Sequence, residues 1–236
     1  MTPLSTESPV CADARPAKSE KTRALIVETA LRLFKERGYD RTTMRAVAAE
    51  AGVSVGNAYY YFDSKEHLIQ GFYGLVESLH AEAVIAILAE HRDFETRLRG
   101  TMLAWLDVAA PYHEFAAQFF KNAGDPASPL SPFSAESAPA REASIDIYRR
   151  VLDGSSAAVP PNLAAELPRL LWLYQMGIVL FWVHDRSAGT ARSRDLIDRT
   201  VPLVARLVAI SRYRMLRSIV DQVVDLVRTL GPGQPS

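Results

Sequence analysis

Apolar residues recur every three or four positions along most of this 236-residue chain, and alternating strand patterns are absent. The first helical pattern follows Ser19, which can cap a helix, and it ends at Gly38, a residue suited to the left-handed conformation after a helix. Two shorter patterns follow Thr43 and Ser54, each of which can also cap a helix. The sequence therefore predicts an all-α protein.

Longer helical patterns continue toward the C-terminal end. A fourth helix, capped by Asp63 or by Ser64, is expected to run to about residue 90. Further helices are expected near residues 94–121, 141–152, 163–186, 193–212 and 214–230. Proline-rich loops are expected at 122–140 and 153–162, the second ending at Asn162 as a cap. Pro168 and Pro202 should each kink a helix or mark its start.

The stretch TMRAVAAEAGVSVGNAYYYF, residues 43–62, has the spacing of a helix-turn-helix motif. Gly52 can supply the turn, and Ala48 is small where the two helices must approach closely. The second helix of such a motif enters the major groove with its N-terminal residues at the base edges. Asparagine can pair with adenine there, and small apolar groups can meet a thymine methyl. The residues at this end are Ser54, Val55, Gly56 and Asn57.

Side chains able to hold phosphates flank this second helix. They are Thr43, Arg45, Tyr59, Tyr60 and Lys65. Tyr61 and Phe62 are expected to turn back into the core. Residues 18–68 hold nine Lys or Arg against seven Asp or Glu, a net charge of +2, and the whole chain is neutral. Charge alone therefore does not indicate DNA binding, and the prediction depends on the motif.

Residues 19–68 resemble the DNA-binding domain of the tetracycline-repressor (TetR) family of bacterial transcriptional regulators. The resemblance lies in ALRLFKERGYDRTTMRAVAAEAGVS followed by YYYFDSKEHL, near the N-terminus. It implies that seven side chains touch DNA: Thr43, Arg45, Ser54, Asn57, Tyr59, Tyr60 and Lys65. The family usually has Thr or Ser at the position of Asn57 and a larger aliphatic residue at that of Ala58. The operator sequence therefore cannot be carried across.

The resemblance also implies a domain organisation. A disordered tail (1–17) would precede the helix-turn-helix domain (18–68), followed by a larger helical ligand-binding and dimerisation domain (69–231) and a short tail (232–236). In the family the last long helices build a homodimer, which here would read a palindromic operator in double-stranded DNA. The apolar positions expected in that dimer interface are Val204, Val208, Leu216, Val220, Val223 and Val227.

Bulky aromatic side chains in the C-terminal part suggest a binding pocket, with a few polar residues that could orient a ligand. The expected pocket residues are Trp105, Tyr112, Phe115, Phe119, Trp172, Gln175, Phe181 and His184. The segment LLWLYQMGIVLFWV, residues 170–183, carries no acidic or basic residue, so a small, largely apolar ligand that is uncharged or weakly polar is expected. The same segment is too short to span a membrane and is interpreted as a buried helix.

Other kinds of chemistry have little support in the sequence. The histidines are scattered without a ligand-pair spacing, so neither a metal nor another cofactor is expected. No nucleophile elbow or phosphate loop is present, which argues against an enzyme. The single cysteine, Cys11, fits a reducing compartment, and the protein is expected to be cytoplasmic without a membrane partner.

Two functions stay open at this level. The first is a ligand-responsive transcriptional regulator, a repressor released from its operator when a small apolar molecule displaces the far end of the fourth helix, near Leu88. The second is a DNA-binding protein of the same fold without such a ligand, controlled by a protein partner. A closed aromatic cavity with a few polar groups would favour the first function, and a filled core would favour the second.

Overall fold

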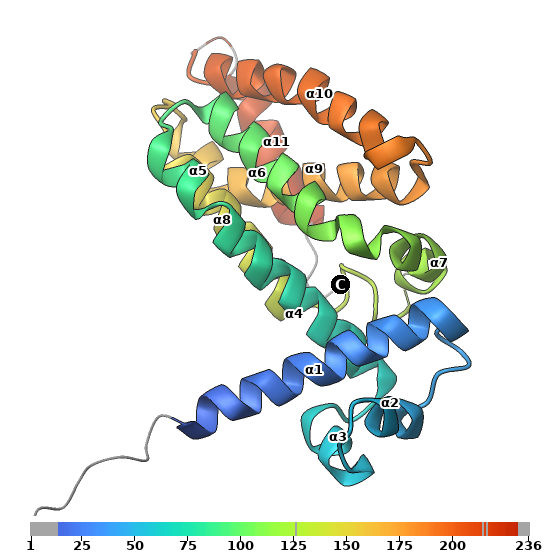
Figure 1. The fold of residues 1–236 in the computed structure, drawn as a ribbon. Coiled ribbons are helices and arrows are strands. Elements are labelled where there is room, and N and C mark those ends of the chain that lie inside the picture. Colours follow the sequence, from blue (N-terminus) through green and yellow to red (C-terminus); the bar gives the residue numbers. More distant parts are fainter. Residues whose placement is uncertain (1–13, 126, 214, 216, 231–236) are drawn as a thin grey trace, which may run out of the picture. The chain divides into compact units, whose positions relative to one another are not determined.

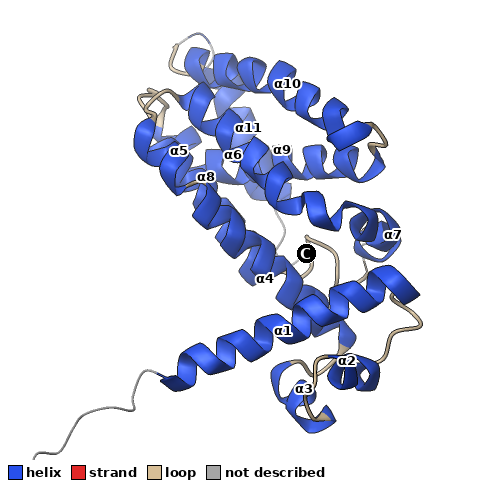
Figure 2. Cartoon of the chain, viewed as in Figure 1, coloured by secondary structure: helices blue, strands red, loops and turns tan. Residues whose placement is uncertain are grey.

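The computed structural model describes residues 14–125, 127–213, 215 and 217–230 (Figure 1). Every regular element within these residues is a helix, as Figure 2 shows, so the predicted all-α class is confirmed. The chain divides into two compact units, Met1–Leu68 and Ile69–Ser236. The assignment of these units to DNA binding and to ligand binding stays a prediction.

The first unit contains α1 (Ala14–Arg37), α2 (Met44–Glu50), α3 (Val55–Tyr61) and the first turn of α4 (Lys65–Ala83). Helix α1 begins before the predicted cap Ser19, so residues 14–17 of the predicted tail are helical. Residues 1–13 and the C-terminal tail, 232–236, lie outside the described residues.

Local capping explains where these short helices begin and end. The Thr43 side chain accepts a hydrogen bond from the Ala46 amide at 3.2 Å, and Ser54 accepts one from the Asn57 amide at 3.1 Å. Gly38 and Gly52 have φ values of 86° and 67°, which other residues rarely adopt. These four sequence predictions are confirmed.

Of the two residues expected to cap α4, Asp63 and Ser64, it is Ser64 that forms the capping hydrogen bond. Its Oγ accepts a hydrogen bond from the His67 amide at 3.3 Å, whereas Asp63 lies 3.5 Å from the His67 ring as a possible ion-pair partner. A side chain that accepts from the third amide of a helix satisfies one of its unpaired N–H groups. The predicted Asp63–Glu66 capping box is therefore not needed to start the helix.

The core of the first unit lies where α2 packs against α1 and α3. Val47, Ala48 and Ala58 are fully buried there, because small side chains let the helices approach closely. Phe62 is also buried, as expected, but Tyr61 is only half-buried. The Tyr61 ring packs edge-on against the exposed Tyr60 ring, with 5.2 Å between centroids, so its expected return to the core is wrong in part.

The second unit is built around α9, which packs against four other helices. Trp172 on α9 is almost completely buried, as are Leu98 on α6 and Tyr148 on α8. The elements after α4 are α5 (Ile85–Glu90), α6 (Phe94–Ala109), η1 (Ala110–Tyr112), α7 (His113–Ala123), α8 (Ala138–Asp153), α9 (Pro161–His184), η2 (Ala188–Thr190), α10 (Ala191–Ile210) and α11 (Arg217–Leu230).

Two helices predicted as continuous are interrupted. The helix expected to reach residue 90 breaks at Val84, between α4 and α5. The helix expected over 94–121 breaks at η1, which contains Pro111. Proline lacks an N–H donor and clashes with the preceding turn, so a local 3₁₀ turn replaces α-helix at that point.

The cap of α9 differs from expectation, and the two prolines inside helices leave a kink as the remaining alternative predicted for them. Helix α9 begins at Pro161 with Pro160 before it, so Asn162 is inside the helix and is not its cap. The Asn162 amide instead donates to Asp221 of α11 at 2.6 Å. Pro168 and Pro202 lie inside α9 and α10, and neither marks a helix start.

A buried arginine fastens the ends of α5 and α8. Arg97 is 2% exposed, and its guanidinium donates to carbonyl oxygens near both helix ends, those of Leu88, His91, Arg150 and Val151. A Cβ atom on residue 154 would lie 2.3 Å from Arg97 Nη2, so only glycine fits there. Helix α8, which contributes to the pocket described below, is thereby fixed at its C-terminal end.

One stretch of the described residues, Lys65–Glu90, is long and apolar enough to cross a membrane, with a mean hydropathy of 1.4. This is a weak indication, because core helices of soluble proteins pass the same test. Within the part of the chain that the structure describes, no three His, Cys, Asp or Glu residues gather as a metal site.

Candidate DNA-binding surface and ligand pocket

The residues predicted to contact DNA lie on and around α3. Asn57 and Lys65 are half-buried, and the other seven are exposed: Thr43, Arg45, Ser54, Val55, Gly56, Tyr59 and Tyr60. Tyr60 is 80% exposed, a high value for an aromatic side chain. The structure therefore leaves the predicted set accessible to a partner.

The two capping hydroxyls keep a donor for a further contact. Thr43 and Ser54 use an oxygen lone pair to accept from a backbone amide. A hydroxyl group also carries one O–H donor, which the capping bond does not use. Arg45 forms no hydrogen bond or ion pair within the described residues. These three side chains can therefore donate to phosphate without a change in the fold.

Gly56 is a glycine that the fold does not require. Its φ angle is not positive, and an added Cβ atom would meet nothing within 4 Å. Glycine in a helix is less stable than alanine by up to about 1 kcal/mol. A bare backbone at the exposed start of α3 therefore suits a surface that a partner approaches closely.

The ammonium group of Lys65 already makes two contacts with Tyr39 inside its own unit. It donates to the Tyr39 carbonyl oxygen at 3.0 Å and lies 4.3 Å from the centroid of the Tyr39 ring. The Tyr39 hydroxyl in turn donates to Glu66 at 3.0 Å. Burial, followed by the nearby Glu66 carboxylate, raises the pKa of Tyr39, so this hydroxyl stays protonated. The expected phosphate contact of Lys65 is thus limited to its remaining N–H donors.

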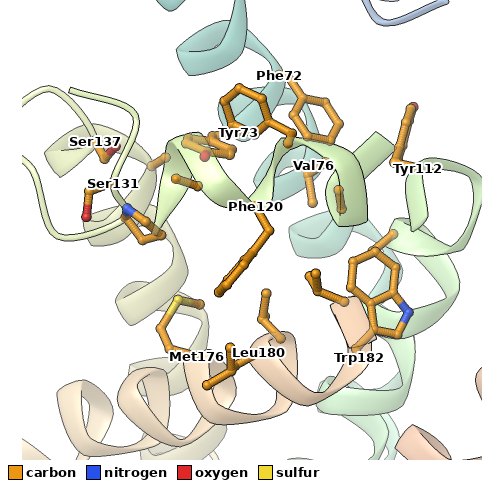
Figure 3. Close-up of a pocket in the computed structure, with 18 of the residues that line it drawn as sticks. Phe72, Tyr73, Val76, Tyr112, Phe120, Ser131, Ser137, Met176, Leu180 and Trp182 are labelled. Carbon is orange, nitrogen blue, oxygen red and sulfur yellow. The ribbon is translucent and has the colours of Figure 1, made fainter. Parts of the chain in front are cut away.

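An apolar pocket of about 720 Å³ lies within the second unit (Figure 3). Its walls come from α4, α6, η1, α7, the following loop, α8 and α9. Labelled side chains in Figure 3 include Phe72, Phe120, Met176 and Trp182, which come from three different helices and surround the space. The volume lies within the range of small-molecule sites, about 300–1,000 Å³.

Five of the eight predicted ligand residues line this pocket: Trp105, Tyr112, Phe115, Phe119 and Trp172. The other three do not. Gln175 is buried and accepts a hydrogen bond from Ser144 at 3.2 Å, while Phe181 is 42% exposed. His184 is exposed and packs edge-on against Phe120. None of these three side chains lines the pocket, so their inclusion in it was wrong: Gln175 is held by Ser144, and the other two are exposed.

Sequence reasoning missed the contribution of α4 to the pocket. Phe72, Tyr73, Val76 and Glu77 all line it. The aromatic pair Phe72–Tyr73 was a usable signal, because it stands in an apolar helix with few charges. No signal of that kind indicated Phe133 or Arg141, which the loop before α8 and the first turns of α8 bring to the same space.

Two polar side chains of the pocket wall, Tyr73 and Arg141, already form hydrogen bonds with backbone carbonyl oxygens of the protein. The Tyr73 hydroxyl donates to the Leu130 carbonyl oxygen at 2.9 Å, and burial raises the pKa of Tyr73. Arg141 Nη1 donates to the carbonyl oxygens of Pro132 and Ser134, each at 2.9 Å. These bonds hold the loop over the pocket.

The predicted dimer residues are divided between core and surface. Val208 and Val220 are 5% and 8% exposed and pack inside their own chain, so their place in a dimer interface was wrong. Val204 is half-buried and Val223 is exposed. Leu216 and the side chain of Val227 lie outside the described residues. The apolar side chains exposed on α10 and α11 include only Val223 of the predicted set among the described residues: Leu203, Leu207, Ile210, Ile219, Val223 and Leu226.

A helix-turn-helix unit joined to a larger helical unit is the organisation of a class of DNA-binding transcriptional regulators. Comparison with known families agrees. Residues 26–71 match the family model "Bacterial regulatory proteins, tetR family", and residues 97–229 match "Tetracyclin repressor-like, C-terminal domain". The chain belongs to the TetR family of transcriptional regulators.

Curated relatives resemble this chain over about a quarter of its length. The HTH-type transcriptional regulator TtgR of Pseudomonas putida is 43% identical over 63 residues, 27% of this chain and 29% of the relative. The HTH-type transcriptional repressor KstR2 of Rhodococcus jostii (strain RHA1) is 40% identical over 62 residues, 26% of this chain and 30% of the relative. The aligned residues make up less than a third of each relative's length. Both relatives are named as transcriptional regulators or repressors.

Solved structures share the fold over most of the chain. A TetR transcriptional regulator from Nitrosomonas europaea ATCC 19718 has a TM-score of 0.62 and 19% identity, covering 78% of this chain and 98% of that chain. The regulator FadR from Bacillus subtilis, solved in complex with stearoyl-CoA, has a TM-score of 0.58 and 16% identity. The match covers 75% of this chain and 97% of that chain. At these identities the likeness establishes the fold alone.

Proposed function

We propose that this protein is a ligand-responsive repressor that binds a palindromic operator as a homodimer and is released by a small, largely apolar molecule. The observation that carries the proposal is the course of α4. Residues 65–68 of this helix belong to the first unit, and residues 69–83 to the second. Phe72, Tyr73, Val76 and Glu77, close beyond that boundary, line the pocket.

Base reading is assigned to the start of α3. Asn57 is the one side chain there with both an amide donor and an acceptor, the pair that adenine offers in the major groove. Val55 is 38% exposed and can meet a thymine methyl. The absence of a side chain at Gly56 supports close approach of the α3 backbone to the DNA.

Phosphate binding is assigned to the side chains around α3. Thr43, Ser54 and the two exposed tyrosines, Tyr59 and Tyr60, offer hydroxyl donors, and Arg45 offers a guanidinium. Lys65 adds the N–H donors that Tyr39 does not use. Such contacts set the orientation of the protein on DNA and bind all sequences alike.

Dimerisation is assigned to the exposed apolar residues of α10 and α11. On each helix these residues are spaced four and then three positions apart, which places them on one face. Leu207 is 64% exposed, and Leu226 is 57% exposed. Apolar rows of this kind, left uncovered in a single chain, are typical of protein interfaces. A two-fold dimer would present two α3 helices to successive major grooves.

Switching is assigned to α4. Leu88, near the predicted far end of the fourth helix, belongs to α5, because α4 ends at Ala83. The middle of α4 forms part of the pocket wall, so the proposed ligand acts there and not near Leu88. A ligand that fits only one position of α4 would shift its first turn and so the spacing of the two α3 helices in a dimer. DNA and ligand then oppose each other by the same coupling free energy.

The alternative, a DNA-binding protein controlled by a protein partner, has less support. A filled core would favour it, and this core instead surrounds a pocket of about 720 Å³. We also propose that the protein acts in the cytoplasm, where its DNA target lies, and we propose no enzymatic activity.

The test begins with selection of the operator from random double-stranded DNA. Operator affinity is then measured with and without a compound whose binding is detected separately by tryptophan fluorescence. We expect the bound compound to weaken operator binding. If a compound fills the pocket and operator affinity stays the same, α4 does not transmit the signal, and the protein-partner alternative gains support.

A further inference from the structure

The pocket wall contains two side chains with a formal charge, Glu77 on α4 and Arg141 on α8. The two differ in how their polar atoms are satisfied. Arg141 directs Nη1 at two loop carbonyl oxygens, each at 2.9 Å. Glu77 Oε2 is buried and has no hydrogen-bond partner within the described residues. Trp182 Nε1 in the same wall is also unpaired in the described part of the chain, but it is an N–H donor and would need an acceptor. Beside Glu77, the missing partner is a hydrogen-bond donor.

His80, one turn further along α4, presents a second hydrogen-bond acceptor beside Glu77. Its ring is fully buried, and Nε2 lies 2.9 Å from the Thr101 carbonyl oxygen, which can only accept. Nε2 must therefore carry the proton, and in the neutral ring Nδ1 is an acceptor. Nδ1 has no hydrogen-bond partner among the described residues and lies 3.9 Å from Glu77 Oε2. Two acceptors thus face each other, and the described side chains place no donor between them.

Tyr148 on α8 carries another buried polar group, although it is not part of the pocket wall. Its hydroxyl is buried without a partner in the part of the chain that the structure describes. Burial raises the pKa of Tyr148 well above its ordinary value, and the charge of Glu77 adds to the rise. Buried polar atoms that lack partners are unfavourable, and the two that lie 3.9 Å apart, Glu77 Oε2 and His80 Nδ1, indicate a site for a group that donates hydrogen bonds.

We propose that the effector is an amphiphile whose protonated amine binds at Glu77 and His80, while its apolar part fills the aromatic pocket. This inference rests on the function proposed above and specifies its ligand. An ammonium group supplies N–H donors to both acceptors and compensates the carboxylate charge. Aromatic rings such as Phe72 and Trp105 in the same wall attract a cation through their faces.

The test uses three probes with one tail and different head groups: n-decylammonium, n-decanol and n-decanoate. All three tryptophans of the chain, Trp105, Trp172 and Trp182, line the pocket, so their fluorescence reports its occupation. Titration of the full-length protein near neutral pH, without DNA, gives one affinity for each probe. We expect n-decylammonium to bind about tenfold to a hundredfold more tightly than n-decanol, and n-decanoate to bind most weakly.

Variants identify the group responsible. Glu77→Gln keeps the shape and can donate to His80, so it should fold normally and bind n-decylammonium no better than n-decanol. Glu82→Gln, an exposed residue on the same helix, is the matched control and should retain the full preference. Thermal unfolding of each variant shows that any loss is one of binding and not of folding.

Each outcome decides the proposal. An equal affinity for the three probes would mean that water alone satisfies Glu77, and unchanged amine binding in Glu77→Gln would mean that a protonated His80 already compensates it. Preference for n-decanoate, lost in Arg141→Gln, would assign the head-group site to Arg141. Any of these overturns the amine inference but leaves a ligand-binding pocket. If no probe binds, the ligand-responsive function itself also fails.

Discussion

The ammonium of Lys65 donates to the backbone carbonyl oxygen of Tyr39 at 3.0 Å and lies over the ring of the same residue. This contact joins the first turn of α4 to the segment that follows α1. A lysine has three N–H donors, so two can still face a phosphate. Lys65 therefore has two roles that can be separated by experiment.

Replacement of Lys65 by methionine should weaken binding to all DNA sequences alike. The slope of log affinity against log salt should fall by roughly one for each Lys65 that contacts a phosphate. Loss of the Tyr39 hydrogen bond should also lower the free energy of unfolding by about 1 kcal/mol. Salt titrations and thermal unfolding measure the two effects, with Lys65→Arg as the charge-conserving control. An unchanged salt slope would leave Lys65 with the structural role alone.

Asn57→Ala should reduce discrimination between the operator and random DNA by about 1–3 kcal/mol, because a bidentate contact to a base would be lost. Arg45 is assigned to phosphate, so Arg45→Ala should weaken binding to both DNAs, and a loss of discrimination would instead place its guanidinium at a base edge. Tyr60→Phe is the comparison, since loss of a phosphate contact lowers both affinities equally. Equal losses on both DNAs for Asn57→Ala would exclude its base-reading role.

Gly56→Ala should separate stability from DNA binding. The added methyl group meets nothing within 4 Å, so reduced freedom of the unfolded chain should stabilise the protein by about 0.4–1 kcal/mol. The same methyl group should hinder close approach of α3 to DNA and weaken operator binding. Gly74→Ala is the matched control, because Gly74 is also helical with open space around its Cβ position. A Gly56→Ala protein with full operator affinity would contradict close backbone approach.

Leu207→Lys should dissociate the proposed dimer while the monomer stays folded, because this side chain is 64% exposed. Val208→Lys, one residue further along, should instead lower the unfolding temperature, because it buries a charge in the core. Ala209→Lys, exposed on the same turn, is the control for added charge. Sedimentation and thermal unfolding distinguish the three. A Leu207→Lys protein that stays dimeric would place the interface elsewhere.

Asp185 predicts a pH dependence of stability. Burial alone would raise its pKa, but hydrogen bonds from the amides and hydroxyls of Ser187 and Ser193 lower the pKa to about 2. Since the unfolded-state pKa is about 3.9, the carboxylate stabilises the fold above that pH and the contribution is lost as the pH falls toward 2.

Asp185→Asn should therefore destabilise the protein near neutral pH by about 1.5–3 kcal/mol, and its deficit relative to wild type should shrink below about pH 4. Unfolding temperatures measured across acidic pH check this. Asp153→Asn, at an exposed carboxylate, should show no such deficit. A deficit of constant size down to about pH 2 would mean that the charge of Asp185 is not what the serines stabilise.

The sequence by itself determined the first unit closely, because the interactions that shape it are local. The Thr43 and Ser54 caps each bond an amide three residues away. Gly38 and Gly52 mark backbone conformations that other residues avoid. Local rules were also sufficient for the all-α class and for the loop between α7 and α8.

Tertiary structure decided which apolar surfaces are buried and which residues share the pocket. Helical periodicity shows that Val208 and Leu207 are both apolar, but only packing against the other helices makes Val208 core and Leu207 surface. Gln175 and Trp172 are likewise on one predicted helix, and only Trp172 faces the pocket. Glu77 and Arg141 are 64 positions apart in the sequence and line one cavity. Such placements depend on how several helices pack together, a long-range property that no local pattern in the chain encodes.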